Sequence, residues 1–111
     1  MECDKVLNQV VLVGKVVALP TLKESVSGNK YASLQLELER PFKNSNGEFD
    51  SDFISITLWK GIAETTTDVC KIGDIIGVKG RIQSYSYENK EGQMYYGYDI
   101  IAEKISFLSN R

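Results

Sequence analysis

The chain has 111 residues, of which 42% are hydrophobic and 25% charged, and this length suits one domain, taken as residues 1–111. Thirteen basic residues against fifteen acidic ones give a formal net charge of −2, which argues against nucleic-acid binding by bulk positive charge and against a polybasic membrane anchor. The absence of histidine excludes Ser-His-Asp triads and histidine-ligated zinc, and two cysteines are too few for a disulfide framework. We therefore expect a cytoplasmic protein with no membrane segment.

Five segments have the hydrophobic pattern of β-strands. Residues 8–17 are apolar at nearly every position, as in a strand covered on both faces by a subunit contact or by the rest of the chain. Strict alternation follows over 31–39, 53–59 and 75–87, and a last, mostly apolar strand spans 98–108. In the fourth strand, alternation predicts four inward positions, at Ile76, Val78, Gly80 and Ile82.

One segment between the third and fourth strands has helical spacing instead. Residues 60–72 predict a short helix ended by Gly73. Its expected buried face consists of Ile62, Ala63, Thr66, Val69 and Cys70. Five strands with one helix in this order predict an all-β fold with one short helix, a five-stranded Greek-key barrel of the OB type. The pattern is also compatible with other small barrels and sandwiches.

Aromatic and cationic side chains alternate on the faces opposite this predicted core. Phe53 and Trp59 point outward from the third strand, with only small hydroxyl side chains between them. Single-stranded nucleic acid needs such a surface, because bases stack on rings at about 1–3 kcal/mol each while Lys and Arg neutralise phosphates. The predicted nucleic-acid-binding residues are Phe42, Phe53, Trp59, Tyr85, Tyr87, Arg40, Lys43, Lys60, Lys79 and Arg81.

Each of these aromatic positions also has a purely structural interpretation. Phe53 could pack under a loop or against a second subunit, and Trp59 could cap the barrel. The two outward tyrosines of the fourth strand could instead be cross-strand partners of Tyr96 and Tyr98 in a hairpin. A lysine or arginine taken singly is usually part of a solvated face.

The sequence offers little for catalysis. An acidic cluster near a turn, Glu48, Asp50 and Asp52, is interpreted as solvated surface rather than as an acid–base pair. Cys70 lies on the apparent buried face of the helix and Cys3 in the N-terminal segment, so neither is interpreted as a nucleophile. We therefore predict a binding protein and not an enzyme, with no metal and no cofactor.

Several segments together resemble a known family. They are residues 8–15 (NQVVLVGK), Pro20 to Lys23, the Ser27-Gly28 turn, Phe53 to Trp59, Ala63-Glu64, Gly80 to Gln83, Ser86-Tyr87 and Gly92. In order and spacing they resemble the bacterial single-stranded DNA-binding protein (SSB) family, over residues 8–108.

The resemblance implies an OB-fold that binds single-stranded DNA without sequence preference in replication, recombination or repair. It implies a cytoplasmic, nucleoid-associated homotetramer, and the apolar first strand fits the family's strand-to-strand subunit pairing. Base stacking is implied at four positions, all aromatic here: Phe42, Phe53, Trp59 and Tyr87.

The sequence also departs from the family pattern. Family members typically carry a flexible tail with an acidic tip that recruits partners, whereas this sequence stops at Asn110-Arg111, so we expect no C-terminal acidic tail and no recruitment through it. Tyr85 stands where a cation is often found, which should weaken phosphate binding. The alternatives are a primosomal accessory protein of the same fold, acting mainly through protein partners, and a carbohydrate-binding OB module.

Overall fold

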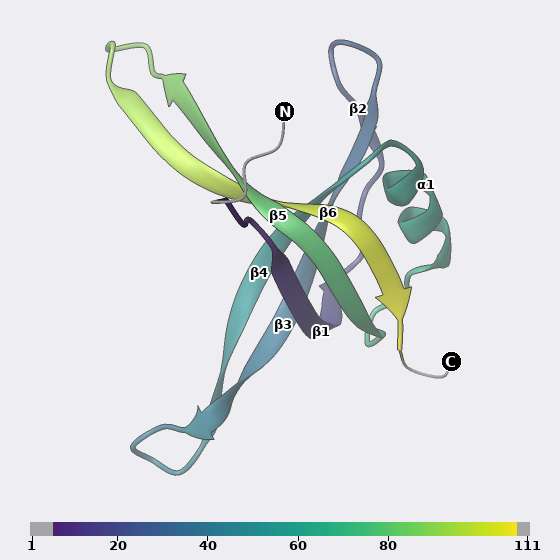
Figure 1. The fold of residues 1–111 in the computed structure, drawn as a ribbon, viewed down its shortest axis with the longest axis vertical. Coiled ribbons are helices and arrows are strands. Elements are labelled where there is room, and N and C mark those ends of the chain that lie inside the picture. The colour runs from purple at the N-terminus through teal and green to yellow at the C-terminus, as the bar shows by residue number, and fades with distance from the viewer. Residues whose placement is uncertain (1–5, 109–111) are drawn as a thin grey trace.

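The computed structural model describes residues 6–108 and contains one helix and six strands (Figure 1). The elements are β1 (Val10–Ala18), β2 (Lys23–Glu24), β3 (Lys30–Lys43), β4 (Phe49–Trp59), α1 (Lys60–Val69), β5 (Ile75–Glu88) and β6 (Met94–Phe107). Cys3 and the Asn110-Arg111 end lie outside the described residues.

The strands close into a barrel. Their order is β1-β5-β6-β4-β3-β2, and β1 also pairs with β3, so the five long strands form a closed ring. The contact between β4 and β6 is parallel, through Ile56 with Ile100 and Thr57 with Ile101, whereas the other pairs are antiparallel. The predicted all-β, five-stranded barrel with one short helix is confirmed. The two-residue strand β2, which pairs with the start of β3, is an addition to it.

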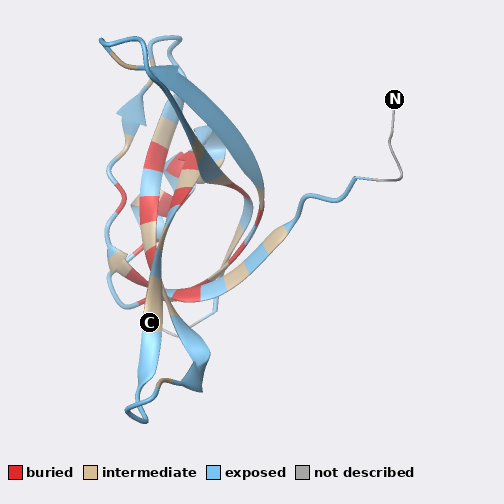
Figure 2. Ribbon diagram, turned by 90° about the vertical axis from the view of Figure 1, so that its left-hand side faces the viewer, coloured by how far each residue is buried: buried red, intermediate tan, exposed pale blue. Residues whose placement is uncertain are grey.

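The core follows the predicted alternation. Inward residues of every long strand meet in one cluster, which α1 covers with Ala63 and Thr66. The most deeply buried large side chains are Val16, Leu34, Leu36, Ile56, Leu58, Ile76 and Val78. Figure 2 shows that buried residues lie along the middle of the strands. Burial of these side chains stabilises the barrel by about 1.5–3 kcal/mol each.

Two hairpins extend beyond this core. The β3–β4 arm (residues 39–52) and the β5–β6 arm (residues 82–99) project from the side of the barrel away from α1 (Figure 1). Both are almost entirely exposed in Figure 2. The prediction that Ile82 is a core residue is therefore wrong: its side chain is 45% exposed, because β5 has already left the barrel at this position.

The helix is shorter than predicted. It ends at Val69, because Cys70 returns to an extended backbone while its N–H donates to the Thr66 carbonyl. Gly73, at a φ of 95°, belongs to the following turn rather than to the helix end, and Val69 is exposed, not buried. Cys70 is buried, as the spacing predicted.

At Gly80, β5 and β6 lie too close together for a side chain. A Cβ at this position would overlap the backbone carbonyl of Ile101, next to an irregularity in the register between Lys79 and Gly80. Only glycine allows this approach.

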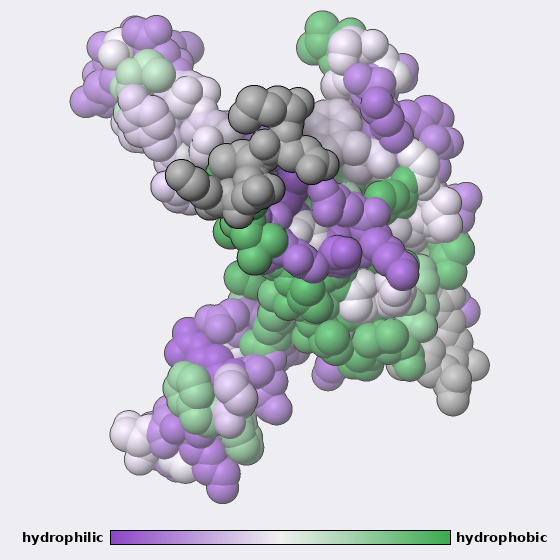
Figure 3. All heavy atoms as spheres, in the orientation of Figure 1, coloured by the Kyte–Doolittle hydropathy of each residue, from purple (hydrophilic) through white to green (hydrophobic). Residues whose placement is uncertain are grey.

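The outer face of β1 is apolar and uncovered. Val11 and Val13 point outward and are exposed, and Figure 3 shows hydrophobic side chains gathered over this strand. The sequence suggested that both faces of this strand are covered, either by a subunit contact or by the rest of the chain. Within residues 6–108 the second explanation is wrong, because no part of the chain covers the outer face of β1. None of the helices in this part of the chain is long and apolar enough to cross a membrane.

Candidate nucleic-acid interface

The outer face of β4 presents two rings with a polar strip between them. Phe53 is 66% exposed, which excludes its packing under a loop of the described chain, and Trp59 is 36% exposed. Trp59 leans on Tyr31 of β3, with ring centroids 5.2 Å apart. Between the rings, the hydroxyls of Ser33 and Ser55 lie 2.8 Å apart. An extended ligand that lies along β4 therefore meets aromatic rings at both ends and hydrogen-bonding groups in the middle.

Backbone geometry helps to hold Trp59 at the end of this face. The next residue, Lys60, has a φ of 56°, a left-handed conformation that is uncommon outside glycine, and it begins α1. The chain thereby turns sharply from strand to helix directly after the tryptophan. Lys60 itself is exposed beside the ring.

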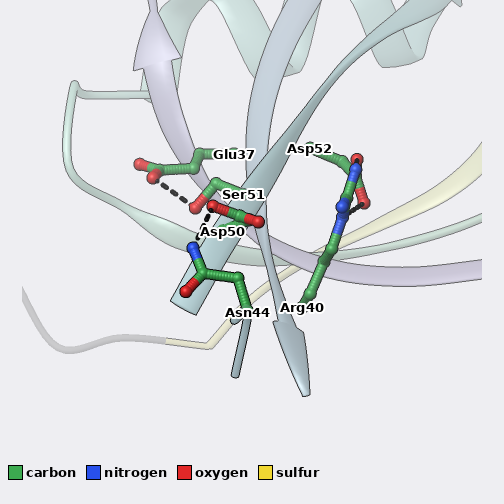
Figure 4. Close-up of polar contacts among 6 residues, drawn as sticks. All are labelled: Glu37, Arg40, Asn44, Asp50, Ser51 and Asp52. Atoms are coloured by element: carbon green, nitrogen blue, oxygen red, sulfur yellow. Dashed lines mark hydrogen bonds and ion pairs between the residues drawn. The ribbon is translucent and has the colours of Figure 1, made fainter. Parts of the chain in front are cut away.

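The β3–β4 arm carries further rings, but one of its cations already has a partner. Phe42 is exposed, and the Lys43 ammonium lies 5.8 Å from the centre of the Phe49 ring. Arg40 makes a forked ion pair with Asp52, whose shortest N–O distance is 2.7 Å (Figure 4). Hydrogen bonding to Arg40 lowers the pKa of Asp52, and the same contact raises the pKa of Arg40.

Two further acidic residues at this hairpin, Asp50 and Glu37, also have hydrogen-bond partners. The Asn44 amide donates to Asp50 at 3.1 Å, and the Ser51 hydroxyl donates to Glu37 at 2.8 Å (Figure 4). No cluster of carboxylates or thiols suited to a metal ion occurs among residues 6–108. Asp50 and Asp52 therefore brace the hairpin.

The β5–β6 arm stacks three tyrosines on one face. The ring centroids of Tyr85 and Tyr87 are 6.4 Å apart, and those of Tyr87 and Tyr95 are 5.3 Å apart, with interplanar angles of 19° and 18°. The proposed pairing of the fourth-strand tyrosines with Tyr96 and Tyr98 is wrong. The register places Tyr95 opposite Tyr87, so Tyr96 and Tyr98 fall on the other face of the arm.

The cations of β5 lie apart from the β4 rings. Arg81 contacts Glu103 at 3.5 Å and donates to the Gln83 side chain at 2.7 Å. Lys79 is exposed and pairs with Val11 of β1, while β6 separates β5 from β4. The two predicted cations of β5 therefore lie on a strand that is not adjacent to the β4 rings.

A cavity lies between β4 and the base of the β5–β6 arm. It has a volume of about 500 Å³ and lies where β4 and β6 diverge. Its lining includes Phe53 and Ser55 from β4 and Ile82, Tyr98 and Asp99 from the other hairpin. The outward ring of β4 is thereby connected to the base of the β5–β6 arm.

Two of these aromatic residues, Tyr31 and Tyr95, were not predicted from the sequence, and Tyr98 was predicted only as a hairpin partner. Tyr31 has the outward parity of its strand and was recognisable in principle. Tyr95 lies before the predicted start of the last strand, and its side depends on the hairpin register, which the alternation of one strand does not fix.

The chain is similar to proteins of one family. A model of the single-strand binding protein family matches residues 7–108. The chain is 41% identical over 101 residues to Single-stranded DNA-binding protein B of Bacillus subtilis, covering 91% of this chain and 89% of that one. It is 38% identical to the single-stranded DNA-binding protein of Enterococcus faecalis, covering 95% of this chain but only 56% of that longer one.

A solved structure agrees with these sequence matches. It is a deletion mutant of the single-stranded DNA binding protein from Thermus aquaticus, which superposes with a TM-score of 0.77 at 26% identity. The match covers 95% of this chain and 52% of that chain.

Proposed function

The chain belongs to the single-strand binding protein family, and on that premise we propose that it binds single-stranded DNA without sequence preference. The observation that carries the proposal is the exposed Phe53, set on one face with Trp59 and connected by a cavity to the β5–β6 arm. Every base has a stacking face, so rings on an open surface bind DNA without reading its sequence.

The mechanism is binding, not catalysis. Bases stack on four rings: Phe42, Phe53, Trp59 and Tyr87. Phosphates are neutralised by the cations around them, of which Lys60 follows Trp59 directly and Lys43 lies on the β3–β4 arm. Arg40 and Arg81 contribute less, because Asp52 and Glu103 already compensate their charges. The bound strand is protected from nucleases and from re-annealing during replication, recombination or repair, in the cytoplasm at the nucleoid.

We propose that the protein acts as a homotetramer. The support is the exposed outer face of β1, where Val11 and Val13 present apolar surface that a second copy of the chain would cover. Light scattering tests this directly. A tetramer is expected, whereas a dimer would favour the primosomal accessory alternative, which the names of the relatives do not otherwise support.

The test of DNA binding uses Trp59, the single tryptophan of the chain, as the reporter. Its fluorescence should be quenched when poly-dT is titrated in, with poly-rU, duplex DNA and a glycan panel as comparisons. Trp59→Ala should weaken binding by about 1–3 kcal/mol, measured by filter binding because the reporter is lost. An absence of both quenching and retention on poly-dT would disprove the proposed function.

A further inference from the structure

Three tyrosines of the β5–β6 arm form an aromatic surface that extends to both sides of Tyr87, one of the four stacking positions named above. We define the tyrosine ladder as Tyr85, Tyr87 and Tyr95, three rings that are each about half exposed on one face of the arm. We propose that the whole ladder binds nucleobases, and that Gly97 makes it continuous. This inference rests on the proposed function and names residues of the same surface.

Gly97 decides where the ring of Tyr85 lies. The two residues face each other across the hairpin, and a Cβ at Gly97 would overlap the ring atoms Cζ and Oη of Tyr85. Because the position has no side chain, the ring lies across the strand and stays beside Tyr87 instead of standing away from the arm. Any larger residue at position 97 would displace it.

The turn of the arm fixes the other end of the ladder. The Tyr95 hydroxyl donates to Gln93 Oε1 at 3.1 Å, and the Asn89 amide donates to the same Gln93 oxygen at 3.0 Å. Asn89 Oδ1 also accepts the N–H groups of Glu91 and Gln93 at 2.9 and 2.8 Å. A ring held in place before binding loses less conformational freedom when a base stacks on it.

The charges of the β5–β6 arm indicate that the tyrosine ladder contacts the bases of the DNA rather than its phosphates. The arm carries one cation, Lys90, against three carboxylates, at Glu88, Glu91 and Asp99. A face of rings with no excess of positive charge offers stacking rather than phosphate neutralisation. The cavity between β4 and the base of the arm is lined by Asp99, which has the strand parity of Tyr95, and by Tyr98, which has the opposite parity, so a strand that crosses β4 reaches the base of the arm.

The opposite face of the arm provides a matched control. Tyr96 and Tyr98 are 76% exposed, more than any ring of the ladder, but Ser86 and Ser84 lie across from them, and the described structure gives neither one a stacked ring partner. Tyr96 is farther from the cavity than Tyr98, which lines it. If the loss of any exposed tyrosine weakens DNA binding, Tyr96→Leu should weaken it too. If only the ladder binds bases, Tyr96→Leu should leave DNA binding unchanged.

The test measures the affinity of the full chain for dT oligonucleotides and for abasic oligonucleotides of the same length, by filter binding. Tyr95→Leu and Tyr85→Leu should each weaken dT binding by roughly 5- to 140-fold and leave abasic binding unchanged, while Tyr96→Leu changes neither. Gly97→Val should weaken dT binding like Tyr85→Leu. The double variant should be no weaker than either single one, because both remove the same ring from the ladder.

The outcomes separate this inference from the proposed function. If the wild-type chain fails to bind dT, the proposed function is wrong. If it binds dT but the ladder variants bind equally well, or if Tyr96→Leu loses as much as Tyr95→Leu, only the ladder is refuted. A changed oligomeric state of the ladder variants without DNA would also overturn the inference, because it would assign this face to a contact between copies of the chain. Circular dichroism of each variant controls for folding.

Discussion

Replacing Phe53 with alanine separates DNA binding from stability, because this ring is two-thirds exposed. Its side chain is 66% exposed, so folding buries about one third of it. Full burial of a phenylalanine is worth about 1.5–3 kcal/mol, so truncation should cost about 0.5–1 kcal/mol of unfolding free energy. That corresponds to a fall in Tm of about 2–8 °C for a domain of this size. The loss of one stacked base should weaken DNA binding by about 1–3 kcal/mol.

The assay pairs thermal unfolding with a dT titration followed by Trp59 fluorescence. Ile72→Ala is the matched control, because Ile72 is 65% exposed and lies in the turn between α1 and β5. Phe53→Ala should lose roughly 5- to 140-fold in affinity, whereas Ile72→Ala should stay near wild type. An affinity of Phe53→Ala within twofold of wild type would refute the assignment of this ring to the interface, and equal losses in both variants would refute its specificity.

Three further results are expected. Leu34→Ala should lower the unfolding free energy by about 2–5 kcal/mol in urea titrations, because Leu34 is fully buried in the barrel; a loss below 1 kcal/mol would contradict this packing. Asp52→Asn should free Arg40 for a phosphate and steepen the slope of log K against log salt by roughly 0.7, and an unchanged slope would show that Arg40 does not reach the DNA. NMR should find the pKa of Asp52 below the usual carboxyl range. The stabilising ion pair is therefore fully present at pH values above the usual carboxyl pKa, and it is lost as the pH falls through the lowered pKa of Asp52. Arg40→Gln should raise the pKa of Asp52.

The strands and the inward residues were predictable because alternation along a strand is a local property. Residues 31–39 and 53–59 alternate strictly, and the structure buries Leu34, Leu36, Ile56 and Leu58 as expected. Phe53 and Trp59 followed from the same parity. The helix was placed correctly, although its end was not. The backbone already becomes extended at Cys70, three residues before the glycine expected to end the helix.

The arms could not be predicted in the same way. Ile82 has the same parity as the buried Val78, but it lies beyond the point where β4 and β6 separate, so no opposite strand covers it. Alternation states which face a side chain takes and not whether anything lies against that face. How far the closed barrel extends along each strand is a property of the whole sheet, and the pattern of one strand does not contain it.

The sequence by itself determined an all-β chain with one short helix, the outward aromatic positions of β4 and the resemblance to the family, because each depends on residue order along one segment or on motif spacing. Only the tertiary structure decided which rings stack on each other and which cations have partners. The stacking of Tyr87 on Tyr95 and the pairing of Arg40 with Asp52 both require two strands in a definite register. Register is fixed when the hairpins form and the barrel closes, since a shift of one residue would move every side chain to the opposite face.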